Sequence, residues 1–530
     1  MKFRHITILA AILVAGCSTE GQSVRPGITS SDDTLLRRWI STIGSDDFGG
    51  RKPTDEYEEK TTSYLIEEME KLGLEPAFDG KWLQEVDMIS TVVRPQDGNV
   101  SLSGVKGAAD LLFPDDVTLW TDRATGRINI EECGFIFAGF GIDAPEYGWN
   151  DFEGIDVKGK VIIAMVNDPG FYDPELFNGR NMTYYGRFTY KFEQAEKMGA
   201  AGCLVIHNTE AASYGWDVVV NGHLGENLAL FDKETGNAGA LAFKGWLNEN
   251  GFRKIAQAAG LDSDLLTQEA KKPGFKAIAL DVKGDVKLDV SYKTDVSHNV
   301  AGVLPGTDLK DEAVVFSAHW DHFGTSKPDE SGDSIYNGAS DNGSGIAALL
   351  LLAKKFGSLP IAPRRSIVFL FPTLEESGLL GSRCYCENPA FPMEKTATCI
   401  NFDCIAPAAL TEDISFLGGG QSCLDFYVMA SAAAQGRYAY FDDDNSDGWF
   451  YRSDHYNFVK RGVPALVMEN GSHLVNPDKP NKYPQKEWYH QPSDEYHEDW
   501  DLSGTIANIN VMFGAACAIA NSDTLPRLTK

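Results

Sequence analysis

The chain has 530 residues, and 76 Asp+Glu against 47 Lys+Arg give it a formal net charge of −29. This acid excess excludes a nucleic-acid-binding protein, which would need clustered Lys and Arg, and it excludes docking on anionic lipid through a basic patch. With 43% hydrophobic residues, the chain can bury the cores of about two to four domains.

The N-terminus has the pattern of a secretory signal. Lys2 and Arg4 precede an apolar run that is too short to span a membrane as a helix. The run ends in Val-Ala-Gly before Cys17, and small residues before a cysteine resemble the lipobox of bacterial lipoproteins. The resemblance implies a signal peptide over 1–16, a lipid on Cys17 and a tether over 17–30. We therefore expect a protein of the bacterial cell envelope, at the outer membrane or its periplasmic face, attached by that lipid alone.

The next segments alternate between helices and strands. Helical spacing of apolar residues predicts helices within 33–41 and 57–73. Apolar runs bounded by Gly and Pro predict strands at 135–138 and 160–166. A helix that ends at Gly199 then leads into a further apolar strand.

The order of these middle elements resembles the protease-associated domain, over roughly residues 130–270. We therefore expect a β-rich insert over 111–279. It would interrupt a single catalytic domain, which is built from 31–110 and 280–530.

The last part of the chain has regular strand–helix alternation. Continuous apolar strands are predicted at 314–318, 366–371 and 399–402, with an apolar helix at 346–356. Buried strands that alternate with helices predict an α/β fold, in which helices sandwich a mostly parallel, mixed sheet. Ligands of such sheets bind beyond the carboxyl ends of the strands.

Histidine and carboxylate residues follow all three strands. His319 and Asp321 follow the first, Glu375 and Glu376 the second, and Asp403 the third. Taken singly, each would be an ordinary surface or capping residue. Because an unpaired charge is costly at a buried strand end, three such ends in succession indicate a binding site for a first-row metal.

Five short segments occur in the order seen in the bi-zinc aminopeptidase family. They are His-Trp-Asp-His, Ser-Asp-Asn-Gly-Ser-Gly, Glu-Glu-Ser-Gly-Leu-Leu-Gly-Ser, Asn-Phe-Asp and Tyr-His-Gln-Pro-Ser-Asp. That family also contains glutamate carboxypeptidases, glutaminyl cyclases and the transferrin receptor. The match covers 285–530 and the N-terminal stretch with Gly49-Gly50-Arg51. It implies a zinc-exopeptidase-like fold.

The resemblance also implies a role for each matching residue. Two zinc ions would share the carboxylate of Asp341 as a bridge. His319 and Asp403 would bind one of the ions, and Glu376 and His490 would bind the other. Glu375 would be the general base, and Asp321 would orient His319. A pair of zinc ions can lower the pKa of a shared water and polarise a carbonyl group.

A later segment resembles the part of the family that lines the site on the substrate side. It contains four candidate substrate-binding residues: Ser453, Asp454, His455 and Tyr456. Just before it, Asp443, Asn445 and Asp447 have the spacing of a calcium loop. The alternative interpretation of these three residues is a polar turn.

The pattern favours a secreted or lipid-anchored metallo-aminopeptidase that hydrolyses the N-terminal residues of peptides. A carboxypeptidase or dipeptidase of the same family is the main alternative, and Arg383 or Arg452 would then bind the substrate carboxylate. A glutaminyl cyclase is disfavoured because 341–345 has the peptidase form, and a receptor-like module would have lost its ligands. The sequence has no His-Glu-x-x-His, Gly-x-Ser-x-Gly or Walker motif.

Overall fold

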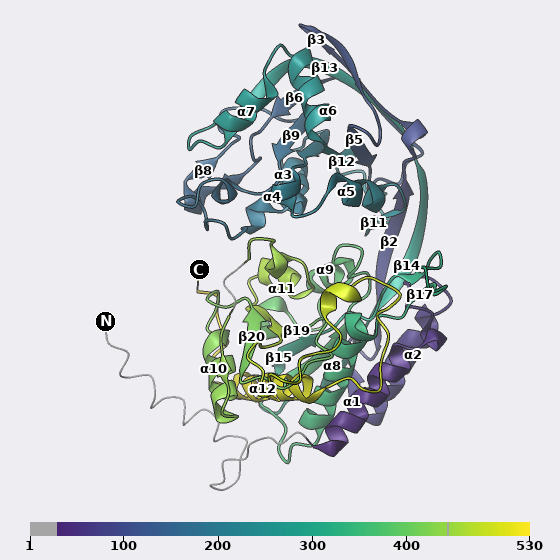
Figure 1. The fold of residues 1–530 in the computed structure, drawn as a ribbon, viewed down its shortest axis with the longest axis vertical. Coiled ribbons are helices and arrows are strands. Elements are labelled where there is room, and N and C mark those ends of the chain that lie inside the picture. Colours follow the sequence, from purple (N-terminus) through teal and green to yellow (C-terminus); the bar gives the residue numbers. More distant parts are fainter. Residues whose placement is uncertain (1–28, 442–444, 530) are drawn as a thin grey trace, which may run out of the picture. The chain divides into compact units, whose positions relative to one another are not determined.

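The computed structural model describes residues 29–441 and 445–529. The predicted signal peptide, Cys17 and Asp443 lie outside these residues. The chain forms two compact units, coloured along the sequence in Figure 1. The first unit contains the described residues of 1–86, 296–443 and 452–530, and the second contains those of 87–295 and 444–451.

The second unit is longer at both ends than the expected insert. Strands β3 (Gly98–Gly104) and β4 (Gly107–Leu111) pair with each other, and β3 also pairs with β13 (Ile278–Asp289). Because these strands belong to one sheet, residues 87–110 and 280–295 lie in the second unit rather than in the catalytic part.

The first unit is built on a mixed sheet. Its strands, in sheet order, are β14 (Ser291–Leu304), β18 (Arg365–Phe371), β15 (Leu309–Ser317), β19 (Thr396–Phe402), β22 (Ala465–Glu469), β20 (Asp413–Leu417) and β21 (Tyr438–Ala439), and β1 (Glu75–Pro76) pairs with β14. Strands β18, β15, β19 and β22 are parallel, whereas β14 and β20 pair antiparallel with their neighbours. The three predicted strands are β15, β18 and β19.

Helices cover both faces of this sheet. On one face lie α1 (Ser30–Ile43), α2 (Glu58–Lys71), α8 (Gly345–Gly357), α10 (Leu424–Ala434) and α12 (Ser503–Ala520); on the other lie α9 (Leu380–Glu387) and α11 (His455–Lys460). On β15, Phe316 packs against the helices of the first face, and Val315 packs in the hydrophobic core on the side of α9 and α11. Successive side chains of a strand point to opposite faces, so β15 contributes to both cores. The predicted α/β sheet with two covered faces is confirmed.

Helix α12 is apolar because it is a core helix. Its length and composition would suffice for a membrane span, but 78% of it is buried inside the protein. Its buried residues belong to the same cluster as those of α1 and α8.

The second unit has its own sheet and helices. Its sheet has the order β4-β3-β13-β6-β9-β10-β12-β5, with β6 (Arg127–Phe137), β9 (Val161–Met165), β10 (Gly202–Ile206), β12 (Phe243–Leu247) and β5 (Val117–Trp120). Strands β6, β9, β10 and β12 are parallel. The helices are α3 (Phe188–Lys197), α4 (Thr209–Ala212), α5 (Trp216–His223), α6 (Glu249–Ala258) and α7 (Ser263–Ala270). Helix α3 and strand β10 are the elements predicted on either side of Gly199. Three short strands of the second unit are β11 (Asn227–Leu230), which pairs with β2 (Leu83–Val92), and β7 (Asp143–Ala144), which pairs with β8 (Trp149–Asn150). In the first unit, β16 (Gly324–Thr325) pairs with β17 (Ile335–Tyr336).

Asn445, expected in a calcium loop, closes a turn of the second unit. Its Oδ1 accepts a hydrogen bond from the Phe450 N–H at 3.0 Å, and its Nδ2 donates to the Met182 carbonyl at 3.0 Å. The Met182 N–H donates in turn to the Asn445 carbonyl at 3.0 Å. The Asn445 side chain thus stabilises this turn.

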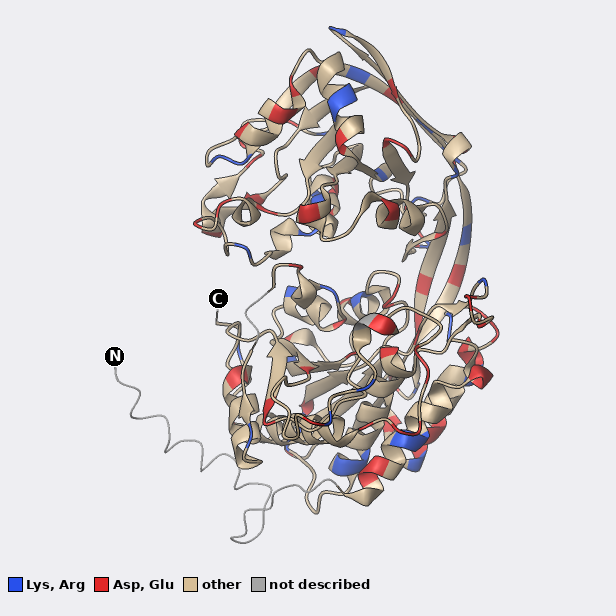
Figure 2. Ribbon diagram, viewed as in Figure 1, with Lys and Arg blue, Asp and Glu red and all other residues tan. Residues whose placement is uncertain are grey.

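Charged residues are distributed over both units (Figure 2). In the first unit the buried Glu68 carboxylate joins α2 to α1, because it accepts hydrogen bonds from Arg38 and from the Trp39 indole, both at 2.7 Å. Asp and Glu residues thus occur in both units rather than in one element (Figure 2).

Candidate metal centre

Asp341 lies between two histidines. Its Oδ1 is 3.3 Å from His319 Nε2, and its Oδ2 is 3.2 Å from His490 Nε2. Asp403 Oδ1 is 3.5 Å from His319 Nε2, and Glu376 Oε2 is 3.3 Å from His490 Nε2. The five side chains predicted as ligands therefore converge, each histidine facing Asp341 and one further carboxylate.

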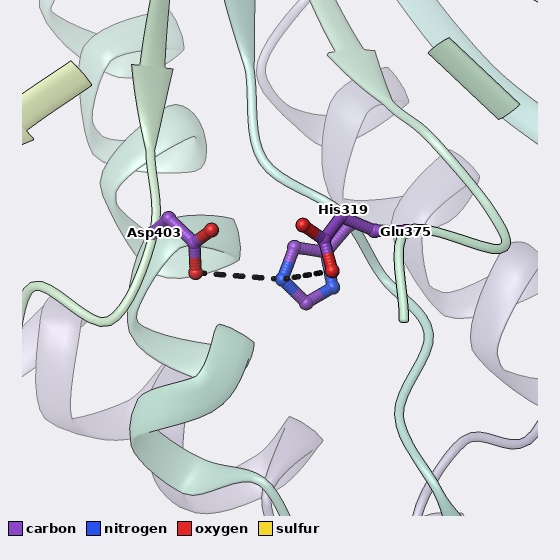
Figure 3. Close-up of side chains that lie close together, drawn as sticks. All are labelled: His319, Glu375 and Asp403. Carbon is purple, nitrogen blue, oxygen red and sulfur yellow. Dashed lines mark ion pairs between the residues drawn. The ribbon is translucent and has the colours of Figure 1, made fainter. Parts of the chain in front are cut away.

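Glu375 lies beside this group. Its Oε2 is 3.9 Å from His319 Nε2, the same ring nitrogen that Asp403 Oδ1 faces (Figure 3). Glu375 is only 9% exposed. Neighbours in sequence, Glu375 and Glu376 thus face different histidines.

The sheet order explains this convergence. Strands β18, β15 and β19 are adjacent and parallel, so the residues that follow them meet at one edge of the sheet. Asp341 comes from the segment before α8, where the Asn342 side chain accepts a hydrogen bond from the Gly345 N–H at 3.1 Å. His490 comes from the loop before α12.

Asp321, predicted to orient His319, contacts the Nδ1 side of its ring. The Asp321 Oδ1 is 3.7 Å from His319 Nδ1. The ring nitrogen donates instead to the backbone carbonyl of Asp321 at 3.1 Å. The Asp321 carboxylate accepts a hydrogen bond from the backbone N–H of Glu375 at 3.1 Å.

The four candidate substrate-binding residues are all buried: Ser453, Asp454, His455 and Tyr456. Ser453 Oγ donates to Asp403 Oδ2 at 2.7 Å and accepts a hydrogen bond from Asn401 Nδ2 at 2.7 Å. The structure thus places Ser453 where it supports a candidate ligand.

Two further residues hold the candidate ligands, although the sequence interpretation gave them no role. His322 Nδ1 is 2.7 Å from Glu376 Oε1. The two carboxylate oxygens of Asp494 accept hydrogen bonds from the backbone N–H groups of Ser340 and Asp341, at 2.8 and 2.9 Å. Both lie inside motifs that carry the family resemblance, and this position was the available signal.

Arg51 is a fully buried cation behind the centre. Its guanidinium donates to the backbone carbonyls of Trp320, Ile43 and Gly338, each at 2.9 Å, and to that of Asn337 at 2.5 Å. Burial lowers its pKa to about 10, so it stays protonated at neutral pH. Arg51 therefore connects the end of α1 with the segments that follow β15 and precede α8.

The electrostatics of the centre suit a cation. Burial lowers the pKa of His319, but the surrounding carboxylates, Glu375 foremost, raise it to well above its ordinary value. Burial also opposes protonation of His490, yet hydrogen bonds to Asp341 and Glu376 raise its pKa to about 10. Negative charge in excess holds these protons, and a divalent cation would satisfy the same charge.

The donor types also fit zinc. Among the described residues, ligand atoms lie within 4.8 Å of one another in three groups: His319, Glu375 and Asp403; His319, Asp341 and Glu376; Asp341, Asp403 and Cys404. Imidazole nitrogen and carboxylate oxygen are usual zinc donors.

One protein-family model matches the part of the chain that contains this centre. Residues 299–514 match the sequence profile of peptidase family M28, and this segment contains all five predicted ligands. The matched segment corresponds to most of the first unit, without α1 and α2.

Curated proteins with sequence similarity to the chain include aminopeptidases. The chain is 28% identical to leucine aminopeptidase 2 of Trichophyton equinum over 257 residues, which are 46% of this chain and 48% of that protein. It is 33% identical to the aminopeptidase NAALADL1 of Rattus norvegicus over 139 residues, 25% of this chain and 17% of that protein. The chain thus spans about half the length of the first relative and a smaller part of the second.

Solved structures resemble the chain over nearly its whole length. An aminopeptidase from Aneurinibacillus sp. strain AM-1 is 16% identical, with 95% of this chain and 97% of that chain covered and a TM-score of 0.48. A zinc aminopeptidase from Bacillus subtilis is 18% identical, with 91% and 94% covered and a TM-score of 0.41.

Proposed function

We propose that the protein is a zinc aminopeptidase with two zinc ions. The observation that carries the proposal is the position of Asp341, whose two oxygens face His319 and His490 at 3.3 and 3.2 Å. His319 and Asp403 would hold one ion, and His490 and Glu376 the other. A carboxylate between two such sets is the arrangement that a co-catalytic pair requires.

The zinc ions, when bound, would polarise the scissile carbonyl and make a water molecule more acidic. Glu375 is the proposed general base, because it lies beside the ligands and is held by Asp321 through its backbone N–H. Its carboxylate would take a proton from the attacking water and return it to the leaving amine.

The proposed substrates are peptides with a free amino terminus. Several curated relatives are named leucine aminopeptidase, which supports this class and makes a leucyl substrate the first to test. The carboxypeptidase or dipeptidase alternative needs an available cation. Arg383, one candidate, pairs with Glu387 on the surface of α9 at 3.2 Å, which disfavours it.

A substrate panel with and without chelator tests this proposal. We expect hydrolysis of aminoacyl-nitroanilides, loss of that activity with a chelator and its return with Zn²⁺. Peptides with a blocked amino terminus and a free carboxyl terminus should remain intact. Activity that is indifferent to chelation would refute the metal mechanism, and cleavage of the blocked peptides alone would establish the carboxypeptidase.

We also propose that lipid on Cys17 attaches the protein to the bacterial envelope, and that the second unit is a protease-associated domain. The first proposal rests on the small residues before Cys17, and the second on the order of β9, α3 and β10. Metabolic labelling with a fatty acid tests the anchor. The Cys17→Ala variant should lose the label, and a label that survives would refute it.

A further inference from the structure

One of the two carboxylate oxygens of Asp403 is bound by a serine hydroxyl. Oδ1 lies 3.5 Å from His319 Nε2, whereas Oδ2 accepts a hydrogen bond from Ser453 Oγ at 2.7 Å. Two buried neighbours fix the direction of this hydrogen bond. Ser317 Oγ donates to Asn401 Oδ1 at 2.5 Å, and Asn401 Nδ2 donates to Ser453 Oγ at 2.7 Å. Because the serine oxygen accepts from Asn401, its own proton is left for Asp403.

The Glu376 carboxylate has the same arrangement. Its Oε2 lies 3.3 Å from His490 Nε2, and its Oε1 lies 2.7 Å from His322 Nδ1. A carboxylate that binds a cation is ionised and can only accept hydrogen bonds, so the ring nitrogen of His322 is the donor. His322 is 2% exposed, and its backbone N–H donates to the Arg51 carbonyl at 3.2 Å. The donor of Glu376 is therefore held in place by its own burial and by its main chain.

These two hydrogen bonds determine how many donors remain for each ion. Asp341 turns one oxygen to His319 and the other to His490. If Asp403 and Glu376 also contribute one oxygen each, every ion has three protein donors: one imidazole nitrogen, one Asp341 oxygen and one further carboxylate oxygen. Three protein donors with a fourth position open are typical of catalytic zinc, whereas four donors are typical of a closed structural site. A carboxylate that turned both of its oxygens to the ion would occupy the open position.

We propose that Ser453 and His322 are positioning residues that hold Asp403 and Glu376 to one metal-facing oxygen each. Both ions would then keep an open position, which water and the substrate carbonyl need. This inference rests on the proposed zinc pair. It gives Ser453 a role other than the substrate contact expected from the sequence, because the serine acts through Asp403 rather than on the peptide.

Visible absorption of the full-length protein with Co²⁺ in place of zinc tests this inference. Four-coordinate Co²⁺ absorbs more strongly than five-coordinate Co²⁺, so the spectrum reports the number of donors. In the wild type we expect strong absorption from both ions. Ser453→Ala leaves Asp403 Oδ2 without its donor, and this oxygen should turn to the ion and weaken the absorption of one Co²⁺. His322→Phe keeps a ring but removes the donor of Glu376, so it should weaken the absorption of the other ion, and the double variant should weaken both.

The matched control is Ser431→Ala. Ser431 is 7% exposed, like Ser453, and its Oγ also donates at 2.7 Å, but to the Val511 carbonyl. S431A should keep the wild-type spectrum. Ser453→Thr and His322→Asn each retain a donor and should restore much of the absorption that S453A and H322F lose.

Two results would overturn the inference: weak absorption from both ions in the wild type, or a wild-type spectrum in S453A with both ions bound. S453A removes a single oxygen atom, so it decides the matter even where H322F fails to fold. Metal analysis separates the two proposals. Two bound ions with unchanged spectra contradict only the role of Ser453 and His322, whereas the absence of bound metal contradicts the proposed function itself.

Discussion

The Asp321 carboxylate accepts a hydrogen bond from the backbone N–H of Glu375, at 3.1 Å. The carbonyl of the same residue accepts the Nδ1 proton of His319, also at 3.1 Å. A single residue, Asp321, in the segment that follows β15, thus holds both the candidate ligand His319 and the candidate base Glu375, which follows β18. The geometry of the two groups is coupled through Asp321.

Replacement of this carboxylate should therefore reduce activity without removing the ligands. In Asp321→Ala the Glu375 N–H loses its acceptor, while the carbonyl that holds His319 remains. We expect a decrease of about 10- to 100-fold in kcat, with zinc content less affected, since partners behind metal ligands typically have effects of this size. The measurement is kcat and KM of the zinc-loaded variant. An unchanged kcat would show that the hydrogen bond does not position the base.

Glu375→Gln should separate metal binding from catalysis. The amide keeps the shape of the side chain but cannot take a proton, and general acid–base catalysis contributes about 10²- to 10⁴-fold. We expect a loss of activity in this range with both zinc ions retained. Glu394→Gln, at an exposed position, is the control and should leave activity unchanged. Near-normal turnover of E375Q would exclude Glu375 as the base.

The strands of the catalytic unit and the ligands at their ends were predictable because both are local signals. Apolar runs indicate β15, β18 and β19, and the residues that follow each run are read directly from the chain. The boundaries of the second unit were not predictable in this way. Strand β3 has the sequence Gly-Asn-Val-Ser-Leu-Ser-Gly, too polar for an apolar-run criterion, and its membership depends on pairing with β13, about 180 residues later.

The contacts of Asp494, Arg51 and Asp321 were not predicted because they join residues that are far apart in the sequence or depend on the course of a turn. Asp494 reaches the backbone of Asp341, and Arg51 reaches carbonyls more than 250 residues away. The sequence shows that these residues are present, but it does not show which distant atoms they contact in the fold. The sequence predicted that Asp321 orients His319, but it did not predict which acceptor of Asp321 binds the ring. The choice between the carbonyl and the carboxylate depends on the turn that follows β15.

Arg51→Ala should destabilise the first unit. The substitution leaves several buried carbonyls without a donor, and each such group costs about 1–3 kcal/mol. We expect the free energy of unfolding to fall by at least about 3 kcal/mol in urea titrations. The control is Arg364→Ala, which removes surface ion pairs to Asp308 and Asp523 and should cost less than about 1 kcal/mol. Equal effects of the two substitutions would contradict the role given to Arg51.

The stability of the second unit should depend on pH through Lys191. This ammonium group is buried and donates to the carbonyls of Asn167 and Tyr185, and burial lowers its pKa from 10.5 to about 7. Between those values the unfolded chain holds a proton that the folded chain lacks, so stability rises with pH over this range. A tenfold change in proton affinity corresponds to about 1.4 kcal/mol.

Urea unfolding at several pH values checks this sign. Lys191→Met removes the titrating group, so its stability should gain less than that of the wild type between pH 7 and 9. Lys197→Met, at an exposed position of the same helix, should follow the wild type. If the free energies of unfolding of wild type and K191M change with pH in parallel, the prediction is refuted. A constant difference between the two curves would reflect only the hydrogen bonds that K191M has lost.

Removal of metal should destabilise one unit and not the other. The five candidate ligands lie in the first unit, where four carboxylates with Glu375 repel one another when no cation is bound. Saturating Zn²⁺ at a thousandfold excess over its dissociation constant would stabilise that unit by about 4 kcal/mol. In thermal scans a chelator should therefore lower the first unit's Tm, Zn²⁺ should restore it, and the transition of the second unit should stay constant. Asp341→Asn should abolish the response to chelator, because the shared carboxylate is lost. A chelator effect that persists in D341N, or that falls on the second unit, would place the metal elsewhere.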